Sequence, residues 1–353
     1  MYMNRLESLR EKMAEQNLDA VFLHQRENVL YMTGFTGTTG GLYVTETRAF
    51  VLVDSRYEEQ AKEQCCGFDV VLSGRPYEIA KVRNGEKRIG FEEDVLTYEV
   101  YQLLKAEAGE EAELVPAAEI MKNLRMIKDE EELAKLKTAV QIADNAFHHI
   151  LPFIREGVYE IDIATELDFY MRKQGATGPS FDFIVAGGAR SAMPHGVAGR
   201  NKLKAHETVL MDYGCVYENY CSDITRTVFL GDPGEEAKAL YYIVKEGQKR
   251  AYANSLIGKP ISFAEQAVRS FFAEKELDSY FGHSLGHGVG LEIHEAPVVN
   301  AKTDARFKNG MVFTLEPGLY IPGACGVRIE DMVLMTYQGT QTLTEAPKEM
   351  IIL

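Results

Sequence analysis

The chain has 353 residues, of which 46% are hydrophobic, and its formal net charge is −15. This length predicts two domains rather than one. The negative charge argues against nucleic acids and anionic membranes as partners. The five cysteines are an odd number and include no C-x-x-C pair, which indicates reduced thiols and a cytoplasmic protein. The first residues are charged and amphipathic, unlike a signal peptide, and we expect no segment that spans a membrane.

The first third of the chain alternates predicted strands with predicted helices. The apolar spacing of 4–16 predicts a helix, and 19–24 reads as a short buried strand. The stretch VLYMTGFTGTTGGLYVT reads as a strand that breaks at its glycines and then resumes. The elements expected after it are a strand at 49–54, a helix at 56–66, a strand-like segment at 87–94 and a helix at 97–108. This alternation predicts an α/β domain, which we assign to residues 1–122.

The remaining residues, 123–353, are predicted to form a second domain after a break near Pro116. Its first helix should begin at Asp129, because Glu132 completes a capping box. Further helices are expected at 160–174, at 235–256 and from Ser262, where Glu265 has the same capping spacing. Strands are expected at 181–186, 208–213, 215–220, 223–230, 287–294, 311–316 and 327–336. Their short connections favour an antiparallel sheet covered by helices.

Four acidic residues occur inside apolar strand sequence, where carboxylates are depleted and costly to bury. They are Asp212, Asp223, Glu316 and Glu330. Any one of them has an ordinary explanation: Asp223 could be a turn acid, and Glu330 could pair with Arg328 on the same strand face. All four together favour a multivalent cation, which neutralises several carboxylates at once.

The stretch GHSLGHGVGLEIHE contains His283, His287 and His294. Its glycines oppose a helix, and the sequence from 287 onward alternates as a strand with His287 and Val289 on one face. A strand of seven residues spans about 23 Å, so one small site cannot take both His287 and His294 unless the glycines bend the chain. We therefore expect a single ligand here, His287, and leave a structural or functional role open for His283.

Four carboxylates and one imidazole form an oxygen-rich set of ligands. Such a set suits Mn²⁺ best, with Co²⁺, Fe²⁺ or Zn²⁺ as alternatives, and differs from a thiolate zinc site. It also suggests two metal ions that share bridging oxygens about 3.5–4 Å apart. A metal pair of this kind makes a bound water acidic and polarises a carbonyl, which is hydrolase chemistry.

With these positions in order, the chain resembles the Xaa-Pro peptidases, which are prolidase (Xaa-Pro dipeptidase) and aminopeptidase P of the pita-bread metallopeptidases. The matching segments are YMTGFTG, MPHG, DYG followed by YCSDITRT, HSLGHGVGLEIHE, TLEPGLY, GVRIED and the ending APKEMIIL. The likeness covers essentially the whole chain. It implies a creatinase-like N-terminal α/β domain followed by a pita-bread catalytic domain, and a homodimer.

The resemblance also implies a role for each candidate residue. Asp212 would bind one metal, Asp223 and Glu330 would bridge both, and His287 and Glu316 would bind the second. The residues expected to act in catalysis are His195, His283, His294, Glu316 and Arg328. The residues expected to contact the substrate are His195, His294, Tyr320 and Arg328.

The function implied is hydrolysis of the Xaa-Pro bond of small peptides by a metal-bridging hydroxide. The intact ligand set argues against the metal-free creatinase branch, and the N-terminal domain argues against a minimal methionine aminopeptidase. The short N-terminal domain favours a dipeptidase. An aminopeptidase acting on longer peptides and a non-catalytic binding protein on the same fold are the alternatives. One departure from relatives is Glu218-Asn219 at the hairpin turn in place of a glycine, which Asn should tolerate.

Overall fold

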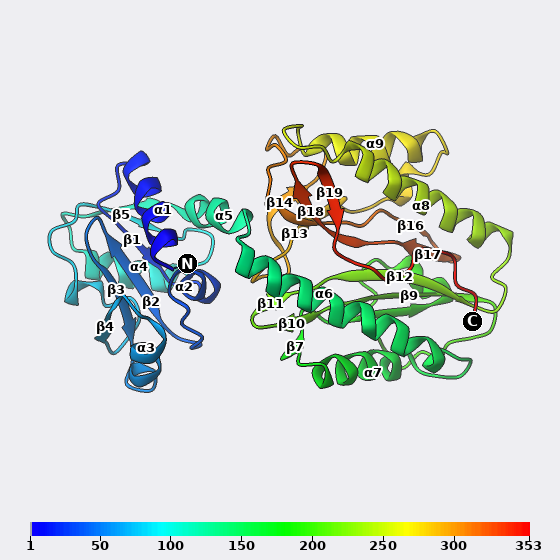
Figure 1. Ribbon diagram of the computed structural model, residues 1–353, viewed down its shortest axis with the longest axis horizontal. Helices are drawn as coiled ribbons and strands as arrows, with labels where there is room; N and C mark the ends of the chain where they lie inside the picture. Colours follow the sequence, from blue (N-terminus) through cyan, green and yellow to red (C-terminus); the bar gives the residue numbers. More distant parts are fainter. Residues whose placement is uncertain (1) are drawn as a thin grey trace. The chain divides into compact units, whose positions relative to one another are not determined.

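The computed structural model describes residues 2–353 (Figure 1). The chain divides into two compact units, one ending at Arg125 and the other spanning Met126–Leu353. The division lies near the end of helix α5 (Ala118–Met126), whereas the sequence predicted a boundary after residue 122. Within the described residues, no helix combines the length and the apolar composition needed to cross a membrane.

The N-terminal unit is built on one six-stranded mixed sheet with the strand order β4-β3-β2-β1-β5-β6. The strands are β1 (Ala20–Leu23), β2 (Gly41–Thr45), β3 (Ala49–Val53), β4 (Asp69–Leu72), β5 (Arg88–Phe91) and β6 (Glu113–Pro116). The pairs β1–β2 and β2–β3 are antiparallel, and the other three pairs are parallel. Besides α5, the helices are α1 (Tyr2–Glu15), α2 (Arg26–Thr33), α3 (Glu58–Gln64) and α4 (Tyr98–Ala108).

Several elements of this unit differ from the prediction: strands β4 and β6 and helix α5 were not expected, and helix α2 replaces a predicted strand. The apolar residues before the glycines, expected to be a strand, form helix α2, which ends at Gly34 with a φ of 77°. Six of the eight residues of α2 are buried, so the 3.6-residue period that would reveal an amphipathic helix is absent from its sequence.

The second unit consists of antiparallel sheets enclosed by helices, as expected. The strands that carry the site are β8 (Ile184–Gly187), β9 (Glu207–Tyr213), β12 (Ile224–Leu230), β13 (Gly286–Gly288), β15 (Val312–Leu315), β16 (Gly318–Ile321), β17 (Cys325–Arg328) and β18 (Asp331–Thr336). One sheet has the order β12-β9-β8, and a second has the order β14-β13-β15-β18-β19, with β14 at Glu295–Val299 and β19 at Gly339–Thr342. Smaller sheets are formed by β16 with β17 and by β7 (Gly178–Pro179), β10 (Cys215–Tyr217) and β11 (Tyr220–Cys221).

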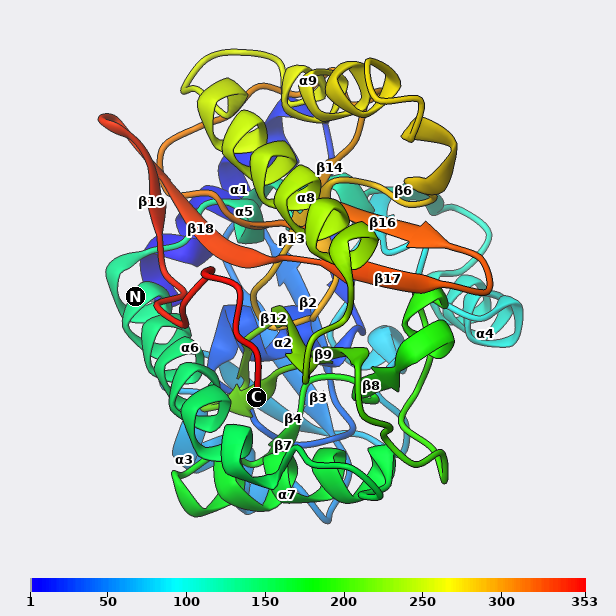
Figure 2. The same cartoon turned by 90° about the vertical axis from the view of Figure 1, so that its right-hand side faces the viewer.

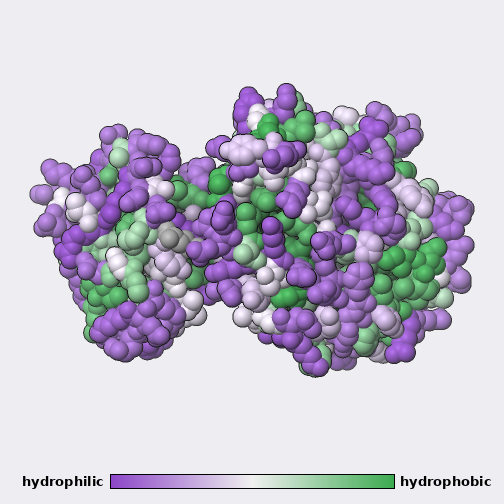
Figure 3. Space-filling view, in the orientation of Figure 1, coloured by the Kyte–Doolittle hydropathy of each residue, from purple (hydrophilic) through white to green (hydrophobic). Residues whose placement is uncertain are grey.

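Two hydrophobic cores support these sheets from opposite sides. Helices α6 (Glu130–Ile150) and α7 (Glu160–Lys173) pack on the sheet that contains β9, and α8 (Glu235–Asn254) and α9 (Ser262–Ala273) pack on the sheet that contains β15. Figures 1 and 2 both show the strands lying between these two pairs of helices. The space-filling view shows mainly polar residues over much of the visible surface (Figure 3). Because the strands lie between the two hydrophobic cores, the strand ends that carry Asp212, Asp223, Glu316 and Glu330 lie between them as well.

The predicted capping box is present at α6 and absent at α9, although α9 does begin at Ser262 as expected. Asp129 and Glu132 form the capping box of α6, with the Asp129 side chain accepting from the Glu132 N–H at 2.9 Å. At α9 the N-cap is Ile261. Glu265 instead accepts from the Leu285 N–H at 2.9 Å and from the guanidinium of Arg269. Glu265 thus supports the segment that leads to the candidate histidines.

The capping box of α6 gives a stability prediction. Replacing Asp129 with Ala removes the acceptor for the Glu132 N–H and should lower the free energy of unfolding of the C-terminal unit by about 1 kcal/mol. Urea unfolding followed by circular dichroism measures the change. The matched control is Glu130→Ala, one residue later on an exposed position. Equal stability of the two variants would contradict a contribution from the capping box.

Candidate metal centre

The five predicted ligands come from both halves of the C-terminal unit and lie at strand ends or strand interruptions. Asp212 is near the end of β9, Asp223 immediately precedes β12, His287 is in β13, Glu316 follows β15, and Glu330 lies between β17 and β18. At four of these positions the strand ladder stops or shifts, so a polar side chain can leave the apolar alternation, whereas Asp212 is still paired with Thr225 and Ile184. The two acid-terminated strands β9 and β15 belong to different sheets.

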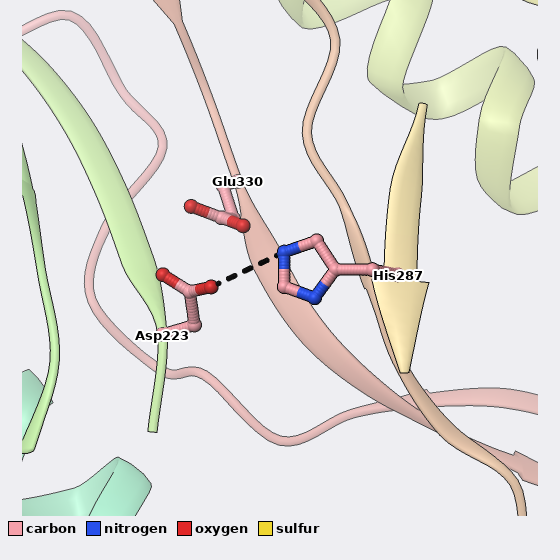
Figure 4. Close-up of side chains that lie close together, drawn as sticks. All are labelled: Asp223, His287 and Glu330. Atoms are coloured by element: carbon pink, nitrogen blue, oxygen red, sulfur yellow. Dashed lines mark ion pairs between the residues drawn. The ribbon is translucent and has the colours of Figure 1, made fainter. Parts of the chain in front are cut away.

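Three of these residues form a compact group of ligand atoms. One atom each of Asp223, His287 and Glu330 lies within 4.8 Å of the others, and Figure 4 shows the three side chains pointing toward a common point. The Nε2 atom of His287 is 3.5 Å from Asp223 Oδ2 and 3.5 Å from Glu316 Oε1. Its Nδ1 atom lies 3.2 Å from the Gly288 carbonyl oxygen, which can only accept. His287 therefore carries its hydrogen on Nδ1 and presents the Nε2 lone pair to the carboxylates.

Asp212 has one oxygen paired and one oxygen open. Its Oδ2 accepts from the Arg328 guanidinium at 2.5 Å, while its buried Oδ1 has no hydrogen-bond partner within residues 2–353. The pairing considered from sequence between Arg328 and Glu330 is not the one formed. Glu330 accepts from the Thr225 hydroxyl at 2.6 Å. A buried carboxylate oxygen without a donor is costly, and a cation ligand would satisfy it.

Burial and mutual repulsion favour the protonated form of these acids. Burial, followed by the charges of the neighbouring carboxylates, raises the pKa of Asp223 and Glu316 well above their ordinary values. The same causes raise the pKa of Glu330 to about 8. Burial lowers the pKa of His287 to about 4, so its imidazole stays neutral, as a metal ligand must. The donor chemistry therefore fits divalent cations, which bind in exchange for protons.

A hydrogen-bonded chain of side chains lies beside the acids. Arg328 Nη1 donates to the Tyr320 hydroxyl at 2.6 Å, and that hydroxyl lies 2.8 Å from His283 Nε2. His283 Nδ1 is 2.8 Å from the Ser284 carbonyl oxygen, so Nε2 accepts the Tyr320 proton. Burial lowers the pKa of His283 to about 3 and raises that of Tyr320 to about 12. Arg328, Tyr320 and His283 are thus each held in one protonation state. The catalytic and substrate-binding roles expected for them are still predictions.

The segment that holds His294 corrects the strand predicted at 287–294. Strand β13 ends at Gly288 with a shift of register between His287 and Gly288, and the following residues bend back. The ring centroids of His287 and His294 are only 4.3 Å apart. The glycines do bend the chain, so His294 reaches the site despite its parity. His195 lies on an exposed loop. Burial is the main cause that lowers the pKa of His294, and His195 is close enough to contribute.

Two threonines that the sequence reading overlooked position the acids. Thr225 donates to Glu330 and accepts from Arg328 Nε at 3.0 Å. Thr314 accepts from the His287 N–H at 3.1 Å and donates to Glu316 at 3.4 Å. Each threonine is two residues from a predicted ligand, Asp223 or Glu316, and so lies on the same strand face. That two-residue spacing is the signal that could have identified them.

Known proteins resemble the chain along its whole length. The model of metallopeptidase family M24 matches residues 134–337, and the model of the creatinase/prolidase N-terminal domain matches residues 5–127. An uncharacterized peptidase of Bacillus subtilis is 43% identical over 99% of this chain and all of its own length. The Xaa-Pro dipeptidase of Pyrococcus horikoshii is 37% identical, with 98% of each chain covered.

Solved structures agree with these sequence relatives. The Xaa-Pro dipeptidase from Bacillus anthracis superposes with a TM-score of 0.96 at 43% identity, with all of both chains covered. An X-Pro aminopeptidase from Thermotoga maritima superposes with a TM-score of 0.88 at 36% identity, covering 96% of this chain and 98% of the other. The expected fold class, an N-terminal α/β domain and a pita-bread domain, is confirmed.

The ligand set gives a prediction for metal content. Protein purified with excess Mn²⁺ and then dialysed should retain two ions per chain, because five ligands with four carboxylates suit a shared pair. Asp223→Asn removes a charge from the centre of the set and should lower the retained metal to one ion or less. Inductively coupled plasma mass spectrometry gives the stoichiometry. Asp232→Asn, an exposed acid paired with Lys238, is the control and should retain both ions.

The raised pKa of Glu330 predicts how stability depends on pH in metal-free protein. Its pKa is about 8 in the folded chain against an ordinary 4.5, so the folded state binds more protons between these values. Its contribution to stability is complete below pH 4.5 and is lost as the pH rises through 8. The variant Glu330→Gln has no such proton to lose. With EDTA present, its melting temperature should therefore rise relative to wild type from pH 5 to pH 8.5, and calorimetry at several pH values measures this difference. A difference in melting temperature that does not change with pH would show that folding does not raise the pKa of Glu330.

Proposed function

This chain belongs to metallopeptidase family M24 and is a peptidase, and we propose that it is an Xaa-Pro dipeptidase with two divalent metal ions. The observation that carries the proposal is the group of buried carboxylates facing the open Nε2 of a neutral His287. The relatives named Xaa-Pro dipeptidase, which match over nearly the whole chain at 37% identity or more, support the choice of substrate.

The proposed metal ligands are the five residues predicted from sequence. Asp212, Asp223, His287, Glu316 and Glu330 would hold the ions, and their oxygen-rich chemistry favours Mn²⁺. When bound, the ions would acidify a water molecule and polarise the peptide carbonyl. Two observations support this assignment. Within the described residues, Asp212 Oδ1 has no hydrogen-bond partner, and the pKa values of Asp223 and Glu316 are raised by burial and by the neighbouring acids.

Other residues of the chain would manage protons and orient the peptide. Glu316 is 3.9 Å from His283 Nδ1, and its raised pKa suits it to take up and return a proton. His294 and His195 would donate to the oxygen of the tetrahedral intermediate. Arg328 and Tyr320 would contact the substrate beside them. Because an Xaa-Pro bond has no N–H, we expect the site to recognise the proline ring by its shape.

The N-terminal amino group of a small peptide complements this group of acids. A cationic group beside several carboxylates gains electrostatic energy, which favours substrates with a free N-terminus. We also propose that the protein acts as a homodimer. An Xaa-Pro aminopeptidase is the second candidate, because the Thermotoga maritima enzyme of that name covers nearly the whole chain at 36% identity.

Substrate length separates these two functions. With Mn²⁺, we expect Ala-Pro to be hydrolysed with a kcat/KM at least 10-fold above that of Ala-Pro-Ala, measured by the release of free alanine. The opposite order would establish the aminopeptidase, and no turnover of either peptide would contradict both functions. Asp223→Asn should lower kcat/KM at least about 100-fold because it weakens metal binding. Asp232→Asn should leave it unchanged.

A further inference from the structure

A buried ion pair lies immediately behind the segment that carries His294. Lys128 Nζ is 2.6 Å from Glu295 Oε1, and the exposed fractions of the two side chains are 0% and 6%. The two residues are 167 positions apart. Neither is among the predicted metal ligands or substrate contacts. A buried ion pair is costly to form and contributes little net stability, so a role in fixing a conformation is the better explanation.

The carboxylate of Glu295 lies inside the bend that follows β13. A side chain at Gly290 would place its Cβ 2.3 Å from Glu295 Oε1, so the carboxylate packs directly on the Gly290 backbone. Glu295 is also paired with Gly288 where the register of β13 and β14 shifts. The bend at 289–294 is therefore folded around this one carboxylate. The bend in turn places the His294 ring 4.3 Å from that of His287.

Lys128 provides a fixed anchor for that carboxylate. Its backbone N–H donates to the Gly310 carbonyl at 2.9 Å, and the next residue, Asp129, is the N-cap of α6. The ammonium thus projects from a point held by both the helix and the loop before β15. Without it, the largely buried Glu295 carboxylate would lose the ammonium that lies 2.6 Å from it, and charged side chains are costly to bury without such contacts.

We propose that Lys128 is a positioning residue that, through Glu295, holds the bend 289–294 closed and so places His294 at the active site. The role of His294 toward the peptide rests on the function proposed above. The structural part, that Lys128 holds the bend, does not. The two parts are tested by different measurements.

Hydrogen–deuterium exchange tests whether Lys128 holds the bend. The amides that report on it are those of Val289 and Gly290, and that of Cys221, which donates to the Gly290 carbonyl at 2.8 Å. Lys128→Met keeps the length and removes the charge, and should raise exchange in peptides covering 286–295 and 221 at least 10-fold. Glu295→Gln keeps the shape and should act in the same direction, which decides the matter if Lys128→Met does not fold.

Lys137→Met is the matched control, because Lys137 is an exposed lysine on the same helix α6. It should leave exchange in the bend unchanged. If Lys128→Met and Glu295→Gln also leave it unchanged, the proposal is overturned whatever the protein hydrolyses.

A double-mutant cycle tests the consequence for catalysis. On Ala-Pro, Lys128→Met should lower kcat about 10- to 100-fold while the protein retains its metal. His294→Ala should lower kcat in the wild type but add little in the Lys128→Met background, because His294 is already misplaced there. Equal effects of His294→Ala in both backgrounds would show that Lys128 acts only on stability. If the wild type does not hydrolyse Ala-Pro but exchange rises as expected, the proposed substrate is wrong and the anchoring role stands.

Discussion

The structure depends on how a protein interior tolerates several carboxylates at one point. The side chains of Asp223 and Glu316 are only 6% and 16% exposed, and burial together with repulsion by the other acids raises the pKa of each well above that of a free side chain. Protonation removes the charge repulsion, but a protonated acid still has buried oxygens that need donors. Divalent cations neutralise several carboxylates at once and use the same oxygens as ligands. The apolar layers on both sides of the strands make that exchange favourable.

Much of this site could be predicted from the sequence, and the reason is energetic. An acid such as Glu316 within an apolar strand is so unfavourable that its presence indicates a compensating partner. The capping box of α6 was equally predictable, because Asp129 and Glu132 are only one helical turn apart. In both cases the signal that permits the prediction is contained within a few residues: an acid among apolar neighbours, or an acceptor one helical turn from its donor.

The errors occur where the partner is distant in sequence. Glu265 has the spacing of a capping residue, but it binds the Leu285 N–H, 20 residues away. The segment 289–294 alternates like a strand, yet it bends around Glu295, whose counter-ion Lys128 is 167 residues away. Helix α2 was missed because burial on nearly all sides erased its period. Local patterns cannot report interactions that only the tertiary fold creates.

Two adjacent acids, Glu330 and Asp331, show how the fold can neutralise one carboxylate and leave its neighbour without an ion pair within the described residues. Burial alone would raise the pKa of Asp331, but Arg226 and Lys348, both paired with its carboxylate, lower it below the ordinary value. Its neighbour Glu330 points to the other side of the chain and has a pKa of about 8. Arg226 also donates to the Glu330 carbonyl oxygen. The guanidinium therefore fixes the backbone of Glu330 without forming an ion pair with its carboxylate. Because successive residues in extended backbone face opposite ways, a single charged network can hold Glu330 in place from behind without neutralising it. The carboxylate is then left available to the metal ions proposed above.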